Sequence, residues 1–78
     1  MAKSIRSKRH RALLAVLVAC RREAGLTQRD LAAKMKRSAS TIAQIESGQR
    51  QVYATELVEF ADAFGLDPAE FIRRWLNW

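Results

Sequence analysis

The sequence predicts an all-α fold, a compact bundle of five helices. Apolar residues recur every three or four positions along most of the chain, which is the period of a helix turn. Serine, threonine or aspartate precedes most of these stretches, and glycine follows most of them; these residue types start and end helices. No stretch alternates apolar and polar residues as a half-buried strand would. At 78 residues, the chain has room for one hydrophobic core.

We expect a first helix from about residue 7 to residue 24. Residues 1–8 are assigned to a flexible basic arm and residues 9–78 to the folded domain. Gly25 ends the helix, because glycine readily adopts the left-handed conformation that closes a helix. The apolar face of this helix is predicted to be Leu13, Val16, Leu17, Cys20 and Ala24.

A second helix has a strong start signal at residues 27–30. The Thr27 hydroxyl is placed to accept a hydrogen bond from the third helical amide, and the Asp30 carboxylate to reach back, which is a capping box. Leu26 and Leu31 flank this signal as a hydrophobic staple. The buried face of the helix is predicted to be Leu31, Ala32 and Met35.

A third helix is expected over residues 39–47. Residues 36–38 then form a tight turn, because Ser38 is a good N-cap for the stretch that follows. Ile42 and Ile45 mark the buried side of this helix, and Gly48 closes it.

The fourth and fifth helices follow a polar loop at residues 49–52. Gly65 stops the fourth helix, and Asp67 starts the fifth as its N-cap, with Pro68 in the first helical position. The fifth helix runs toward Trp78. The apolar face of the fourth helix is predicted to be Ala54, Leu57, Val58, Ala61 and Phe64.

Positive charge is concentrated in the first half of the chain. Residues 1–37 carry eleven Lys and Arg against two acidic residues, a balance of +9, whereas residues 38–78 carry three against six, a balance of −3. Such asymmetry favours a polyanionic partner, either nucleic acid or anionic lipid headgroups, over a merely solvated basic surface. A membrane surface is the weaker choice, because the charged positions of the first helix flank its apolar run rather than line one face.

Neither a cofactor nor a catalytic centre is predicted. The single Cys20 cannot form an intramolecular disulfide, and together with the lone His10 it offers no zinc site. The sequence has no nucleophile–base pair and no glycine-rich phosphate loop. A single unpaired cysteine suits a reducing compartment, so we expect a cytoplasmic location.

One segment also resembles a targeting signal. Leu17-Val18-Ala19-Cys20 is similar to the lipobox at which bacterial lipoproteins are cleaved. We favour a helix here, because an apolar run of about eight residues is near the short limit for a signal peptide. Cleavage before Cys20 would also delete a helix that the core needs. No segment approaches the ~20 apolar residues that span a bilayer.

The second and third helices, with a three-residue turn between them, have the spacing of a helix-turn-helix. From Leu17 to Phe71 the sequence resembles the Cro and lambda-repressor (Xre) family of DNA-binding domains. The sequence differs from the family's pattern in the turn, where Lys36 and Arg37 replace the usual glycine and small apolar residue. It also differs at Val52, where proline is frequent in the family. The matching residues are Arg21, Gly25-Leu26-Thr27-Gln28, Leu31-Ala32, Ser38-x-Ser40-Thr41-Ile42-x-x-Ile45-Glu46-x-Gly48, Leu57, Ala61 and Phe64-Gly65-Leu66.

The resemblance implies which residues face DNA. Ala39, Ser40 and Gln44 match the base-reading positions, and only Gln44 has an amide able to make the paired contact to adenine. The alternative for Gln44 is an exposed glutamine without a role. Arg21 and Glu46 match a structural ion pair that ties the first helix to the end of the third. Contacts to DNA phosphates are expected from Thr27, Gln28, Arg29, Lys36, Arg37, Ser38, Thr41 and Arg50.

Both ends of the chain leave alternatives open. The basic residues Lys3, Arg6, Lys8, Arg9 and Arg11 form either an arm that reaches along the DNA groove or a solvated tail. The fifth helix carries more apolar surface than one face can bury. A homodimer through it would place two recognition helices about 34 Å apart, whereas the alternative is that its tryptophans cap this chain's own core. The residues assigned to this interface are Phe71, Ile72, Trp75, Leu76 and Trp78.

The sequence therefore predicts a transcriptional regulator that binds double-stranded DNA, a homodimeric repressor of bacterial or phage type. It is not expected to be an enzyme or to bind a membrane. The alternative is an antitoxin or adaptor of the same fold, whose C-terminal helix binds a partner protein such as a toxin.

Overall fold

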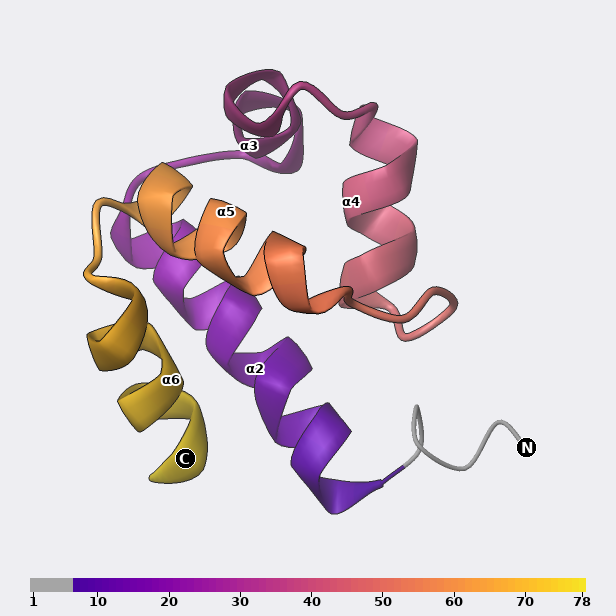
Figure 1. Cartoon of the computed structure of the whole chain (residues 1–78). Helices are drawn as coiled ribbons and strands as arrows, with labels where there is room; N and C mark the ends of the chain where they lie inside the picture. The colour runs from indigo at the N-terminus through magenta and orange to yellow at the C-terminus, as the bar shows by residue number, and fades with distance from the viewer. Residues whose placement is uncertain (1–6) are drawn as a thin grey trace.

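The computed structural model describes residues 7–78, and over this range it has five α-helices and no strand. In Figure 1 the long α2 crosses the molecule diagonally, with α6 along one side of it, α4 on the other side and α5 lying across it. The predicted all-α, five-helix fold is confirmed. None of the described helices is long and apolar enough to cross a membrane. The helices are α2 (Lys8–Glu23), α3 (Gln28–Met35), α4 (Ala39–Glu46), α5 (Ala54–Phe64) and α6 (Pro68–Leu76).

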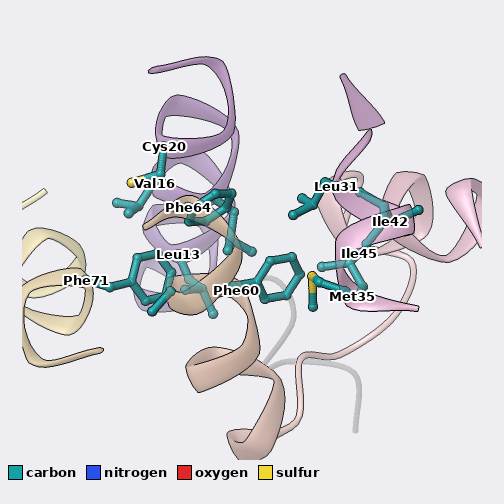
Figure 2. Close-up of a cluster of buried hydrophobic side chains, with 13 residues drawn as sticks. Leu13, Val16, Cys20, Leu31, Met35, Ile42, Ile45, Phe60, Phe64 and Phe71 are labelled. Atoms are coloured by element: carbon teal, nitrogen blue, oxygen red, sulfur yellow. The ribbon is translucent and has the colours of Figure 1, made fainter. Parts of the chain in front are cut away.

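All five helices contribute to one core. Figure 2 shows Phe60 at the centre of this cluster, with Leu13 and Phe71 on one side of it in this view and Met35 and Ile45 on the other. The rings of Phe60 and Phe64 are stacked with their centroids 6.0 Å apart, and those of Phe64 and Phe71 are tilted at 5.9 Å. Burial of these large side chains provides the main force that holds so small a domain together.

The buried face of α5 differs from the prediction. Phe60 is fully buried although we did not assign it to the core, whereas Ala54 is exposed and Val58 has 47% of its surface exposed. Glu56 is also buried on this face. The predicted faces of α3 and α4 are confirmed, as is that of α2 except for Ala24, which is exposed at the helix end.

Local hydrogen bonds set the helix ends. The Thr27 hydroxyl accepts from the Asp30 amide, and the Asp30 carboxylate accepts from the Thr27 amide, both at 3.0 Å. The bond from the Thr27 amide is the largest cause that holds the pKa of Asp30 below its ordinary value, and the Thr27 hydroxyl adds to it. Ser38 and Asp67 accept from helix amides in the same manner at the starts of α4 and α6. These three predicted caps are confirmed.

Residues 8–11 of the basic segment at the start of the chain are helical. Ser7 caps α2 by accepting a hydrogen bond from the His10 amide at 3.0 Å, so the helix begins at Lys8. The assignment of Lys8 to the flexible arm is therefore wrong, because Lys8 lies in the first turn of α2 together with Arg9 and Arg11. The favourable cap explains why the helix extends this far. Lys3 and Arg6 lie outside the described residues.

Candidate DNA-binding surface

The turn between α3 and α4 closes without glycine. Lys36 has the left-handed conformation, with φ at 57°, and ends α3. Its amide donates to Ala33 at 3.3 Å, and the Arg37 amide donates to the Ala32 carbonyl at 2.9 Å. The left-handed conformation costs a lysine roughly 1–2 kcal/mol, and these hydrogen bonds together with the packing of the two helices offset that cost. The predicted tight turn is thereby confirmed.

The packing of α4 fixes which of its side chains point outward. Ile42 and Ile45 are fully buried against α3 and the core, so the opposite face is presented to solvent. Ser40 and Gln44 lie one helical turn apart on that face, and both are exposed. Neither side chain has a hydrogen-bond partner within residues 7–78. Ala39 is only half-buried and packs against the core, so its methyl group is less available than the other two side chains.

Glu46 connects the end of α4 to α2 and α3. Its carboxylate accepts from Arg21 Nε at 2.7 Å and from Arg21 Nη2 at 3.2 Å, and the Gln28 amide nitrogen donates to it at 2.9 Å. Arg21 Nη1 also donates to the Leu26 carbonyl at 2.9 Å. The Arg21 and Glu46 side chains are only 11% and 7% exposed. The predicted ion pair is present, and it holds the start of α3 and the end of α4 in fixed positions against α2.

The hydroxyl groups near the turn are used as helix caps. Ser38 Oγ accepts from the Thr41 amide at 3.1 Å and lies 2.9 Å from Thr41 Oγ1. Thr27 caps α3, as described above. Hydroxyl groups both donate and accept, so these caps leave Thr27 and Ser38 able to interact with an anion while they hold the helix ends.

The buried carboxylate of Glu56 lies beside two arginines that were predicted to bind DNA phosphates. Glu56 Oε1 and Oε2 each accept from Arg50 at 3.0 Å, and the Tyr53 amide donates to Oε1 at 2.9 Å. Arg37 Nε lies 3.6 Å from the same carboxylate. Burial acts to raise the pKa of Glu56, but the Arg50 and Tyr53 hydrogen bonds, with the charges of Arg50 and Arg37, outweigh it and hold this pKa below its ordinary value.

The sequence analysis missed Glu56. The available signal was an acidic residue at the third position of α5. A carboxylate there can accept a hydrogen bond from the backbone amide of the residue just before the helix. Arg50 also lies over the Tyr53 ring, 4.9 Å from its centroid, so its guanidinium has partners on two sides. Arg29 and Lys36, in contrast, are exposed basic residues on and beside α3.

The C-terminal helix contributes to the core and to the surface. Phe71 is fully buried, so its assignment to an intermolecular interface is wrong: its ring fills the space between α5 and α2 in this chain. Trp75 is half-buried and its indole nitrogen donates to the Arg9 carbonyl at 2.8 Å, which fastens α6 to α2. Leu76 and Trp78 remain 55% and 64% exposed. The apolar surface available to a partner is therefore smaller than the sequence suggested.

No metal site is evident in residues 7–78, where no three His, Cys, Asp or Glu side chains gather in a set that fits a metal ion. Cys20 is buried in the core, and burial is the main cause that raises the pKa of its thiol.

Comparisons with known proteins agree with this geometry. The structure is similar to an XRE-family like protein from Pseudomonas syringae pv. tomato str. DC3000, with a TM-score of 0.85 and 32% identity over 96% of this chain and 92% of that chain. Two structures of the clp gene regulator ClgR from Corynebacterium glutamicum have TM-scores of 0.80 and 0.79, each at 25% identity over 91% of this chain, and cover 76% and 92% of their own chains. The comparison with curated proteins gave no match.

A family model described as a helix-turn-helix domain matches residues 12–72, which include α3, the turn and α4. This fold is typical of DNA-binding transcriptional regulators rather than of enzymes. The match in sequence, the structural likeness at 32% identity and the arrangement of α3 and α4 agree, and the chain belongs to the XRE family of helix-turn-helix proteins.

Proposed function

We propose that this protein is a cytoplasmic, sequence-specific transcriptional repressor that inserts α4 into the major groove of DNA. The observation that carries the proposal is the outward face of α4, where the side chains of Ser40 and Gln44 are exposed and make no hydrogen bond within the described chain. A glutamine amide can donate and accept at once, which matches the edge of an adenine, whereas a serine hydroxyl serves several bases.

Phosphate contacts would position this helix without specifying sequence. Arg29 and Lys36 are exposed and basic, and the capped starts of α3 and α4 present backbone amides and hydroxyl groups at Thr27 and Ser38. Helix N-termini attract phosphate through their free amides and the helix dipole. In this proposal Gln28 and Thr41 adjoin those starts as secondary contacts, and Arg37 and Arg50 bind phosphate in competition with the carboxylates that hold them.

Replacement of Gln44 by alanine tests base reading. We expect Gln44→Ala to weaken binding to the preferred DNA site by about 1–3 kcal/mol, because one paired base contact is lost. Affinity for random DNA should stay nearly unchanged, since phosphate contacts dominate it. The preferred site is obtained by selection from a random DNA pool, and both affinities are then measured by fluorescence anisotropy at fixed salt.

Gln49→Ala is the matched control, because Gln49 is an exposed glutamine just beyond α4. It should leave both affinities unchanged. Equal losses on the selected site and on random DNA after Gln44→Ala would contradict base reading by this residue.

We further propose that the protein acts as a homodimer through the exposed end of α6. Leu76 and Trp78 are the large apolar side chains left exposed there, and a two-fold contact would cover both on each copy. Trp78→Ser should weaken dimerisation by about 2 kcal/mol, as expected for an aromatic residue at the centre of an interface. Sedimentation velocity across a concentration series measures this change.

Arg73→Ser is the control for the dimer test, because Arg73 is exposed on the same helix but contributes little apolar surface. A wild-type protein that stays monomeric at concentrations that saturate DNA would contradict the dimer. It would favour the alternative in which α6 binds another protein, such as a toxin. Fluorescence of Trp75 and Trp78 on mixing with the product of a neighbouring gene detects that partner.

A further inference from the structure

Arg37 lies in the turn of the helix-turn-helix, but acidic residues of α5 hold its side chain. Arg37 Nη2 donates to Glu59 Oε1 at 2.8 Å, and Arg37 Nη1 donates to the Met35 carbonyl at 3.0 Å. The side chains of Arg37 and Glu59 are 33% and 44% exposed, so solvent and ions reach both. The guanidinium is thus fixed in place, and its closest anionic partner is a surface carboxylate.

The second carboxylate near Arg37 is already satisfied. Glu56 is held by Arg50 through two hydrogen bonds and by the Tyr53 amide, and its distance of 3.6 Å from Arg37 Nε is the longer of the two contacts. Glu56 is therefore neutralised without Arg37. Glu59 has no cationic partner other than Arg37 among the ion pairs of the described residues, so the two charges depend on each other.

Other basic and acidic side chains also face each other around the Arg37–Glu59 pair. Lys34 and Lys36 at the end of α3, and Glu59 and Asp62 on α5, line one open hollow between the two helices. The acidic residues of α5 thus lie beside the basic C-terminal end of α3, just before the turn to α4. A carboxylate in this place lowers the positive potential that DNA phosphates encounter.

We infer that Glu59 regulates the DNA affinity of this interface by competing with phosphate for Arg37. The inference rests on the function proposed above. Carboxylate and phosphate oxygens both accept hydrogen bonds from a guanidinium in the same geometry, so a phosphate can take the place of Glu59 without moving Arg37 far. The exchange costs little, because an exposed ion pair contributes little to stability and Glu59 can turn to solvent. Glu59 thereby limits sequence-independent attraction to DNA.

The test compares charge-matched variants on a random-sequence duplex. Glu59→Gln removes the negative charge that competes with phosphate for Arg37, and it should tighten binding roughly 3- to 10-fold at low salt, with a steeper dependence on salt by about one counterion. Asp62→Asn is the control, because it removes one negative charge from the same helix and the same hollow, and Asp62 forms no ion pair with an arginine among residues 7–78. This control should tighten DNA binding less than twofold, because it removes only a repulsion between Asp62 and DNA phosphates that salt screens.

The variants are also made in an Arg37→Ala background. If Glu59 acts through Arg37, Glu59→Gln should give no more than the Asp62→Asn increase there, and circular dichroism should show the same thermal unfolding in each matched pair. An equal increase from Glu59→Gln and Asp62→Asn, or an increase from Glu59→Gln that persists without Arg37, would overturn the inference while leaving the proposed function intact. Absence of any DNA binding by the wild-type chain would overturn both.

Discussion

Phe60→Ala is expected to lower the free energy of unfolding by about 3–5 kcal/mol. Phe60 is fully buried at the centre of the core, and its ring stacks on Phe64. Truncation removes apolar surface from the core and leaves a cavity that short, mutually packed helices can fill only in part. Domains of this size are stable by only a few kcal/mol, so a large fraction of the variant should be unfolded at 37 °C. Urea unfolding followed by circular dichroism measures the change.

Val58→Ala is the control on the same helix. Val58 is 47% exposed, and its truncation should change the unfolding free energy by no more than about 0.5 kcal/mol. The sequence analysis placed Val58 in the core and did not place Phe60 there, so the pair also tests which face of α5 is buried. A larger loss for Val58→Ala than for Phe60→Ala would show that α5 is rotated relative to the structure described here.

Arg21→Ala is expected to destabilise the fold by about 3 kcal/mol. The variant leaves the carboxylate of Glu46, whose side chain is only 7% exposed, with Gln28 as its one remaining side-chain partner among residues 7–78. A buried charge that has lost its counterion is costly because it is no longer solvated by water or paired within the protein. Since Arg21 joins α2 to the end of α4, DNA binding should fall together with stability. Urea unfolding and fluorescence anisotropy of the same samples measure both.

The double variant Arg21→Met/Glu46→Leu tests whether Arg21→Ala loses stability because the Glu46 charge is left unpaired or because packing is lost. It removes both charges and keeps apolar volume, so it should be more stable than Arg21→Ala. If the double variant is instead less stable than Arg21→Ala, the pair contributes net stability and the stranded-charge argument is incorrect. A loss below about 0.5 kcal/mol for Arg21→Ala would show that the pair is effectively solvated.

The sequence predicted the helices well because their signals are local. Each cap depends on residues no more than three positions apart, such as Thr27 with Asp30, and each can be recognised without the rest of the fold. The buried faces of α3 and α4 were also clear, because these short helices carry their large apolar residues on one side only. The longer α5 carries apolar residues around most of its circumference. Periodicity alone therefore left open which stripe of α5 is buried.

The candidate site was predictable in its outline but not in its electrostatics. The frame of the motif placed Ser40 and Gln44 on the outward side of α4, and the structure confirms that both are exposed. It gave no indication that Arg37 and Arg50 are held by Glu56 and Glu59. Two of these contacts, Arg37 with Glu56 and with Glu59, join residues about twenty positions apart, one in the turn before α4 and the others on α5. Such pairs have no spacing rule, because they depend on how the helices are oriented in space.

The sequence by itself determined five helices, three of their N-terminal caps, the helix-turn-helix and the excess of positive charge in the first half of the chain. Tertiary packing decided that Phe60 rather than Val58 enters the core, that Phe71 is enclosed while Leu76 and Trp78 stay exposed, and that acidic residues of α5 hold two arginines. One physical cause separates what the sequence determined from what tertiary packing decided. Hydrogen bonds at helix ends act over a few residues, whereas the burial of a side chain and the partner of a charge depend on which neighbouring helices pack around them.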